Sequence, residues 1–154
     1  MTPEEEAQIR KFNNELSADI HVGLVMIGDG RSKVFEHFCE DLIRLAPKIR
    51  LTQEERKPEE APAIQVRHAL VYHAIPLGKE LTPFLDALSA SDGGAENIPT
   101  SIRDHLKRIH VPAMLRLFIS QQCPFCPATV QRIIPLLEAN ELIHLTIIDC
   151  TLFP

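Results

Sequence analysis

The 154-residue sequence has no tryptophan, a single tyrosine, and no run of Lys or Arg longer than two residues. Its formal net charge is −5. Scarce aromatic rings and scattered positive charge argue against a nucleic-acid-binding surface or a surface for anionic membranes. The longest apolar runs, such as residues 22–27, are also far too short to span a bilayer. The sequence therefore predicts neither a nucleic-acid partner nor a membrane partner.

The overall composition is that of a globular protein, because 45% of the residues are hydrophobic and 24% are charged. The length suits one domain or two small ones. Residues 2–6 read Thr-Pro-Glu-Glu-Glu, which is acidic where a signal peptide would be basic and then apolar. We therefore expect a cytoplasmic protein.

Hydrophobic periodicity predicts an alternation of helices and strands, and thus an α/β fold. Thr2 and Glu5 form the pattern of a capping box at the start of the first helix. Ser32 is the expected cap of the next one. The expected helices cover residues 3–16, 32–46, 79–88, 98–110 and 123–138, and the expected strands cover residues 20–27, 49–51, 63–66, 69–74, 114–119 and 143–148. Residues 52–61 are expected to form a loop, and residues 89–97, which include Gly93 and Gly94, a linker.

The order of elements restarts after the linker, which indicates an internal repeat. With a shift of about 95 residues, the apolar positions Phe35, Phe38 and Leu42 of one helix fall on Val130, Ile133 and Leu137 of another. We therefore expect two units, a complete one over residues 1–90 and a partial one over residues 98–154.

Four cysteines are too few for a disulfide-built secreted domain, and two of them form a single C-x-x-C, Cys123 and Cys126. A strand, a short turn and this motif at a helix N-terminus favour redox chemistry. Unpaired N–H groups and the helix dipole would stabilise a thiolate on Cys123, which makes it the expected attacking sulfur. Cys126, nearly one turn further, is the expected resolving sulfur.

Two alternatives apply to these cysteines. A structural zinc site needs four ligands, and the sequence has no second C-x-x-C, although Cys150 and His144 could complete a set. Cys123 and Cys126 could also be inert core residues. Redox chemistry is the preferred interpretation, and we predict no metal and no cofactor. Cys39 lies on an apolar helix face and is expected to be a buried core thiol, and Cys150 a packed residue at a strand end, with a third redox thiol as the alternative.

The segment Cys123-Pro124-Phe125-Cys126-Pro127, after Leu117-Phe118-Ile119-Ser120, resembles the active site of the glutaredoxin-like protein disulfide oxidoreductases. It is also similar to the N-terminal domain of the flavoprotein subunit of alkyl hydroperoxide reductase. Segments 75–81 and 148–153 resemble the ends of the first unit and of the second central strand in these proteins. The resemblance implies tandem thioredoxin-like units, the first of which has Gly28 to Ser32 in place of a C-x-x-C.

The resemblance further implies a thiol–disulfide oxidoreductase that carries electrons from a flavoprotein reductase to protein disulfides or to a peroxiredoxin. The alternative is a non-catalytic partner-binding module or a truncated remnant, because no cis-proline strand follows the second central strand. Pro62 is either the cis-proline counterpart in the first unit or a plain turn residue. We also expect the strand 143–148 to have an open side that leaves Leu145 and Ile147 uncovered. Either a dimer covers them, through another chain or through the complete first unit, or the second unit is loosely folded alone.

Overall fold

The structure is a computed structural model that describes residues 1–57, 61–90 and 98–154. The helices and strands have the following bounds: α1 (Pro3–Glu15), β1 (Ile20–Met26), α2 (Gly30–Leu45), β2 (Ile49–Glu55), β3 (Ala63–Arg67), β4 (Leu70–His73), the 3₁₀ helix η1 (Gly78–Glu80), α3 (Leu81–Ser89), α4 (Thr100–Leu106), β5 (Ala113–Ile119), α5 (Cys126–Ala139) and β6 (Ile143–Asp149). Among the described residues, no helix is both long enough and apolar enough to cross a bilayer.

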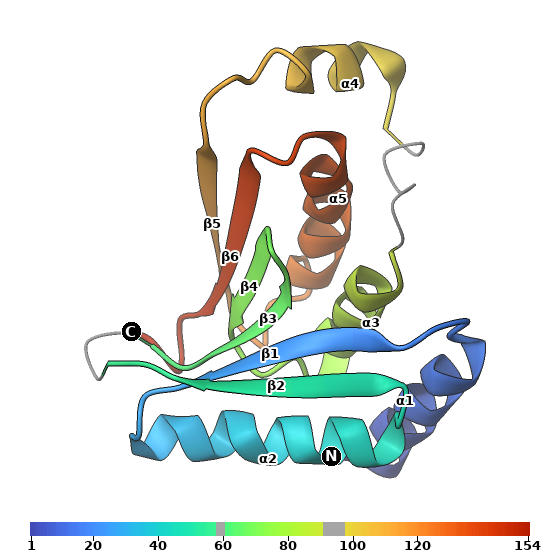
Figure 1. Cartoon of the computed structure of the whole chain (residues 1–154), viewed down its shortest axis with the longest axis vertical. Coiled ribbons are helices and arrows are strands. Elements are labelled where there is room, and N and C mark those ends of the chain that lie inside the picture. Colours follow the sequence, from blue (N-terminus) through green and yellow to red (C-terminus); the bar gives the residue numbers. More distant parts are fainter. Residues whose placement is uncertain (58–60, 91–97) are drawn as a thin grey trace.

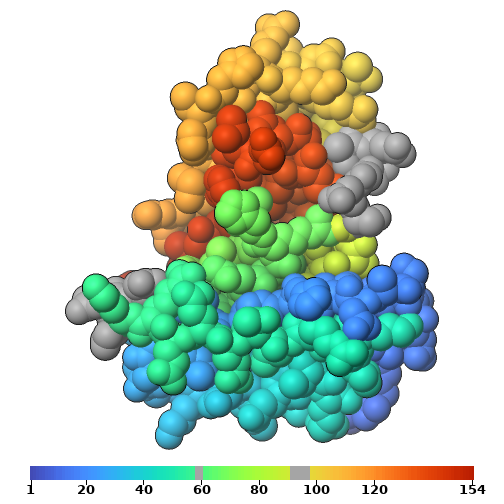
Figure 2. Space-filling view, viewed as in Figure 1, coloured from blue at the N-terminus to red at the C-terminus, as the bar shows by residue number. Residues whose placement is uncertain are grey.

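All six strands belong to one sheet in the order β2-β1-β3-β4-β6-β5 (Figure 1), so the predicted α/β class is confirmed. β1 pairs with β2 in parallel and with β3 antiparallel, and β3 and β4 form the predicted hairpin. The parallel pairing of β4 with β6 joins the first four strands to the last two. In the space-filling view the first half of the chain occupies the lower end of the molecule, and the second half the upper end (Figure 2).

One face of the sheet carries the hydrophobic core. Buried residues of α1, α2, α3 and α5 form a single cluster with the inward-facing strand residues, which include Leu24, Tyr72, Leu145 and Ile147. The strand register places a row of residues on the opposite face, and it runs across all six strands as Thr52, Gly23, Gln65, Val71, Thr146 and Arg116. The four helices are therefore gathered on one face.

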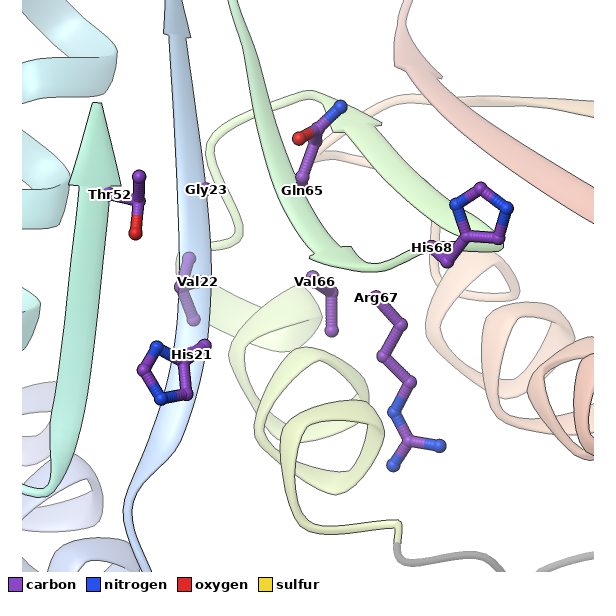
Figure 3. A pocket seen from close by; sticks show the side chains of 8 residues that line it. All are labelled: His21, Val22, Gly23, Thr52, Gln65, Val66, Arg67 and His68. Carbon is purple, nitrogen blue, oxygen red and sulfur yellow. The ribbon is translucent and has the colours of Figure 1, made fainter. Parts of the chain in front are cut away.

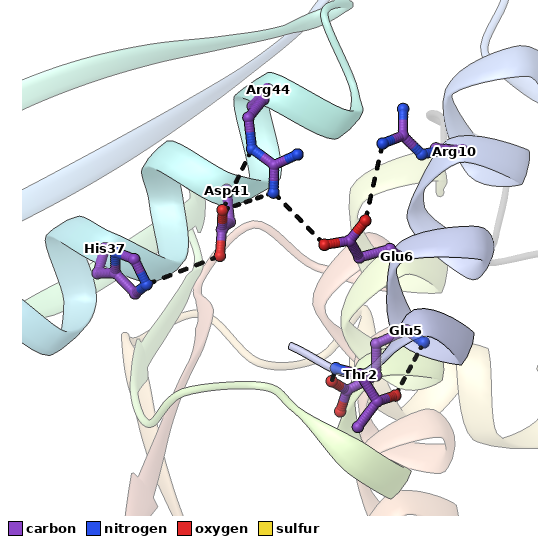
Figure 4. A network of polar contacts seen from close by, with 7 residues as sticks. All are labelled: Thr2, Glu5, Glu6, Arg10, His37, Asp41 and Arg44. Carbon is purple, nitrogen blue, oxygen red and sulfur yellow. Dashed lines mark hydrogen bonds and ion pairs between the residues drawn. The ribbon is translucent and has the colours of Figure 1, made fainter.

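Polar contacts cap the start of the N-terminal helix and link the helix to α2 (Figure 4). The capping box is confirmed, because the Thr2 hydroxyl accepts the Glu5 N–H at 3.2 Å while the Glu5 carboxylate accepts the Thr2 N–H at 2.7 Å. Glu6 lies 3.7 Å from Arg10 on the same helix and 3.5 Å from Arg44 on α2. These exposed ion pairs each contribute about 0–1 kcal/mol, so they orient α1 on α2 more than they stabilise it.

Local chemistry moves several predicted boundaries. The cap of α2 is Asp29 instead of Ser32, because the Asp29 carboxylate accepts both the N–H of Ser32, at 2.8 Å, and its hydroxyl, at 3.0 Å. β2 continues to Glu55, well into the predicted loop 52–61, because the whole strand pairs with β1. Of the predicted linker, residues 91–97 lie outside the described residues, and the helix expected over 98–110 is limited to α4.

The expected open side of the strand 143–148 is wrong. β6 pairs with β4 on one side and with β5 on the other, so Leu145 and Ile147 are buried. Among the described residues, the strands without a second neighbour are β2 and β5. A second unit that folded by itself would leave β6 uncovered, but β4 ends the hairpin of the first four strands and its outer edge accepts β6.

Pro62 precedes β3, and no described peptide bond is cis. The cis-proline interpretation of Pro62 is therefore wrong, and the residue leads into a strand with an ordinary trans bond. Its carbonyl oxygen lies 2.9 Å from Nδ1 of His73. Proline suits this place, because a residue at the start of a strand has no ladder hydrogen bond to lose.

The burial of β6 leads to a stability prediction. We expect Leu145→Ala to lower the free energy of unfolding by about 2–5 kcal/mol, because the side chain is fully buried in the core cluster. Met114→Ala, which alters an exposed side chain of β5, should change it by less than about 0.5 kcal/mol. Urea denaturation followed by far-UV circular dichroism measures both variants. Equally small effects would mean that β6 is not packed between its two neighbours.

Candidate active site

The C-x-x-C motif lies in the turn between β5 and α5. The turn is closed by a hydrogen bond from the Cys123 N–H to the Ser120 carbonyl at 2.9 Å. The helix begins at Cys126 and not, as predicted, at Cys123, and the proline in its first turn is Pro127 instead of Pro124. Both thiols are free, and each is half-buried. The structure thus brings together the two predicted site residues, with Cys123 just ahead of the helix and Cys126 as its first residue.

The two thiols are electrostatically different although they are hydrogen-bonded to each other. The hydrogen bond from the Cys126 thiol, followed by that from the Phe125 backbone N–H, lowers the pKa of Cys123 below its ordinary value. Burial, and then the hydrogen bond to Cys123, raises the pKa of Cys126. Cys123 is therefore the better thiolate and Cys126 holds its proton. The backbone N–H groups of Phe125 and Cys126, which stand at the N-terminus of α5, add to the effect of the Cys126 thiol, as expected for a helix start.

Glu80 is a third member of the site that the sequence analysis missed. It ends η1, its exposed fraction is only 2%, and neither carboxylate oxygen has a hydrogen-bond partner among the described residues. Burial, followed by the nearby charge of Asp149, raises the pKa of Glu80. Its negative charge adds to the raised pKa of Cys126 and partly opposes the lowering of the pKa of Cys123. A buried acid without a partner holds a proton readily, so Glu80 can exchange one with the thiols.

The position of Glu80 follows from its neighbours along the chain. Leu81, Phe84 and Leu85 come directly after it and are buried, so the start of α3 carries the glutamate into the core. Where α3 packs beside α5, the Gln131 amide donates to Asp86 at 2.8 Å. An acidic residue directly before a helix whose first residues are mostly apolar was a signal in the sequence. Sequence alone, however, does not say that this helix lies beside the cysteines.

The other two cysteines are outside the pair. Cys39 is fully buried, which confirms the prediction of a core thiol, and burial raises its pKa to about 12. Cys150 is exposed, and its N–H donates to the Ile119 carbonyl at 3.0 Å. The expectation of a packed strand-end residue is therefore wrong for Cys150. It lies just beyond the paired strands, where no further strand residue covers it.

Among the described residues, no group of three His, Cys, Asp or Glu side chains is arranged to hold a metal ion. The zinc alternative with His144 and Cys150 fails on distance as well. His144 is near the start of β6 and Cys150 follows its end, so about 20 Å of extended strand separates them. The His144 ring instead packs on the ring of His68, with the ring centroids 5.7 Å apart.

A pocket of about 390 Å³ lies on the sheet face opposite the helices (Figure 3). Side chains of His21, Gln65, Arg67 and His68 line it, and none of the four cysteines does. The Arg67 guanidinium forms an ion pair with Glu138 of α5, with Nη1 3.3 Å from Oε1. The pocket is therefore separate from the thiol site.

No family model matches the chain. Curated relatives nevertheless align with nearly all of it. A protein named NADH dehydrogenase from Ferdinandcohnia aciditolerans is 26% identical over 99% of this chain, and the F component of alkyl hydroperoxide reductase from Staphylococcus epidermidis is 23% identical over 95% of it. The chain spans only about 30% of the length of these relatives.

Two solved structures share the fold. The NTD_N/C domain of alkyl hydroperoxide reductase AhpF from Enterococcus faecalis superposes with a TM-score of 0.77 at 19% identity, over 100% of this chain and 83% of that one. A protein disulfide oxidoreductase from Aeropyrum pernix superposes with a TM-score of 0.76 at 13% identity, over 96% of this chain and 74% of that one. The resemblance predicted from the sequence is thus confirmed, and the chain has the thioredoxin-like α/β fold of these two kinds of protein.

Proposed function

We propose that the protein is a thiol–disulfide oxidoreductase in which Cys123 and Cys126 are the catalytic residues. The observation that carries this proposal is the place of the two free, half-buried thiols, with Cys123 in the turn just ahead of α5 and Cys126 as the first residue of that helix. The pKa directions support it, since the pKa of Cys123 is lowered and that of Cys126 is raised. An attacking thiol has to be ionised and accessible, whereas a resolving thiol has to wait until a mixed disulfide exists. Two inert structural cysteines would need no such difference.

The reaction begins when the Cys123 thiolate attacks one sulfur of a partner disulfide. The partner S–S bond breaks, its second sulfur leaves as a thiolate, and a mixed disulfide joins Cys123 to the partner. Cys126 then gives its proton to the Glu80 carboxylate and attacks the Cys123 sulfur. The mixed disulfide breaks, the partner leaves as a dithiol once it is protonated, and Cys123 and Cys126 become the disulfide. An external reductant restores the dithiol.

The names of the relatives suggest partners for this cycle. We propose a flavoprotein reductase as the electron donor, and a peroxiredoxin or another disulfide-bearing protein as the acceptor, because curated relatives are named as the F component of alkyl hydroperoxide reductase. We also propose that the protein acts without a resident cofactor and in the cytoplasm, a compartment that keeps thiols reduced. We further propose that the chain consists of two thioredoxin-like units, a complete one over residues 1–90 and a partial one over residues 98–154.

A non-catalytic partner-binding module is the second candidate. The observation that favours it is that all described peptide bonds are trans, so no cis-proline among the described residues lies beside the thiols. In that case Cys123 and Cys126 would serve only to pack the turn, and the protein would bind its partner without exchanging a disulfide with it. Chemical trapping separates the two candidates, because only an exchange enzyme holds a partner through Cys123.

The pKa order predicts the order of alkylation. We expect iodoacetamide near neutral pH to label Cys123 faster than Cys126 or Cys39, because Cys123 has the lowered pKa and Cys39 is buried with a pKa of about 12. Timed labelling of the reduced protein followed by peptide mapping measures the order. Preferential labelling of Cys39 or Cys126 would sink the assignment of Cys123 as the attacking thiol.

The mechanism predicts different trapping by the two serine variants. Cys126→Ser should accumulate a mixed disulfide on Cys123 with a disulfide-bearing protein such as insulin, because the resolving sulfur is missing. Cys123→Ser should accumulate little, because Cys126 keeps its proton. Non-reducing electrophoresis and mass spectrometry measure the adducts. Equal trapping by both variants, or none by either, would contradict the mechanism.

The raised pKa of Glu80 predicts how stability depends on pH. The folded state holds the Glu80 proton more tightly than the unfolded chain does, so this residue costs stability as the pH rises through its folded pKa. Glu80→Gln should therefore be more stable than the natural protein by about 1–3 kcal/mol at pH 8, and by much less at pH 4. Urea denaturation at both pH values measures this.

A matched control is Glu4→Gln, which changes an exposed glutamate and should not alter the pH profile. The same two variants also test the mechanism. Glu80→Gln should slow the second step, the attack of Cys126 on the mixed disulfide, while it leaves the first step nearly unchanged. A Glu80→Gln variant with the natural pH profile and the natural rate of the second step would show that Glu80 takes no part.

A further inference from the structure

The side chain of Glu80 has no hydrogen bond of its own to fix it. It is 2% exposed, and neither carboxylate oxygen has a partner among the described residues. A group that takes up a proton has to lie within about 2.6–3.2 Å of the donor, and a misplacement of about 1 Å can slow a step by about 100-fold. The position of Glu80 therefore depends on what holds the backbone on either side of it.

The backbone just before Glu80 is not rigid by itself. η1 is a single 3₁₀ turn of three residues, and the hydrogen-bond geometry of such turns is poor. It begins at Gly78, whose φ of 59° lies in the left-handed region that glycine adopts without strain. The Glu80 N–H donates to the Leu77 carbonyl at 3.2 Å, the long end of the usual range. The segment therefore needs contacts from another element to keep one position.

α1 supplies such contacts on both sides of Glu80. The N–H of Gly78, two residues before it, donates to Oε1 of Glu5 at 2.7 Å. The side-chain amide of Gln8 donates to the hydroxyl of Thr82, two residues after Glu80, at 2.8 Å. Glu5 and Gln8 are three positions apart on α1, so their side chains share one face of that helix. The two contacts therefore enclose Glu80 along the chain.

Glu5 is itself held from a second side. Its other oxygen, Oε2, accepts the Thr2 N–H at 2.7 Å in the capping box (Figure 4). A hydrogen bond to a charged acceptor is about twice as strong as a neutral one, and a carboxylate that accepts an N–H at each oxygen has little freedom to turn. Ile9 and Phe12 anchor the same helix in the core. α1 is therefore a fixed support for the segment that carries Glu80.

We propose that Glu5 and Gln8 are positioning residues that hold Glu80 within reach of the Cys126 thiol. This inference rests on the proposed function, in which Glu80 takes the proton of Cys126, and it goes beyond that function by assigning a role to α1. The two residues act through the backbone on either side of Glu80. Their loss should therefore slow only the step that uses Glu80.

The reduction of dithiobis(nitrobenzoate) separates the two steps. In the first step the Cys123 thiolate attacks the disulfide of the reagent, and one nitrothiobenzoate leaves as a coloured thiolate. In the second step Cys126 gives its proton to Glu80 and attacks the Cys123 sulfur, the second nitrothiobenzoate leaves, and the two cysteines form a disulfide. All proteins carry Cys150→Ser, because the exposed Cys150 would react as well. Stopped-flow absorbance measures the two releases as separate phases.

The decisive variant is Glu5→Met/Gln8→Met, which removes both contacts and keeps the side chains nearly the same size. We expect it to slow the second phase by about tenfold and to change the first phase by less than about twofold. Glu5→Gln keeps an acceptor for the Gly78 N–H, so its second phase should stay close to the natural rate, whereas that of Glu5→Met should not. In a Glu80→Gln background the double variant should cause no further slowing, because it acts through Glu80.

Two other variants of the same helix are the controls. Thr2→Ala removes the other hydrogen bond of the capping box, and Glu6→Gln weakens the link to Arg44, but neither changes a contact on either side of Glu80. Both should show the natural rates in both phases, even where they lower the stability of the protein. Far-UV circular dichroism checks that each variant is folded. The single variants Glu5→Met and Gln8→Met carry the test if the double variant does not fold.

The outcomes are separable. A natural second phase in Glu5→Met/Gln8→Met, or an equal slowing in the Glu80→Gln background, would overturn the positioning role and leave the thiol exchange intact. The same slowing in Thr2→Ala or Glu6→Gln would also overturn it, because a general loosening of α1 would then be the cause. If the protein with natural Glu5, Gln8 and Glu80 releases no second nitrothiobenzoate, the proposed function fails, and this inference with it.

Discussion

The parallel pairing of β4 with β6 is the contact on which the rest of the structure depends. Four residue pairs, from Leu70 with Leu145 to His73 with Ile148, join the two halves of the chain into one sheet. This register buries Leu145 and Ile147 beside Tyr72, and each square ångström of apolar surface so removed from water contributes about 25 cal/mol. Because both α3 and α5 pack on the joined sheet, Glu80 from the first half comes to lie near thiols of the second.

Two buried acids, Glu80 and Asp149, influence each other, and Glu80 also influences the thiols. The Asp149 carboxylate accepts the N–H of Thr151 at 2.7 Å. Glu80 has no such donor among the described residues, and the charge of Asp149 further favours its neutral form. The Tyr72 hydroxyl is likewise buried without a partner there, and burial raises its pKa. Glu80 is therefore the acid of this region that takes up a proton more readily, as the proposed mechanism requires of the group that deprotonates Cys126.

Local patterns predicted the elements well, and the contacts between elements poorly. Three correctly predicted features depend on residues that are close in sequence. They are the capping box at Thr2, the hairpin of β3 and β4, and the proximity of Cys123 to Cys126. The burial of Glu80 and the pairing of β6 with β4 depend on how two distant segments meet, which periodicity does not encode. The predicted cap of α2 was wrong for a simpler reason. Asp29 and Ser32 are both good N-cap residues, and only the path of the backbone decides which of them caps the helix.

β5 packs against the core on one face and pairs with β6 along one edge, and odd- and even-numbered residues of the strand have different surroundings. Its odd-numbered residues Leu117 and Ile119 support α5 and the core, whereas the even-numbered residues are exposed. Natural edge strands are usually protected from self-association by a charge or a proline, and β5 has Arg116 in its middle and Pro112 just before its start. A single positive charge disfavours pairing with an identical edge, because like charges that lie opposite each other repel.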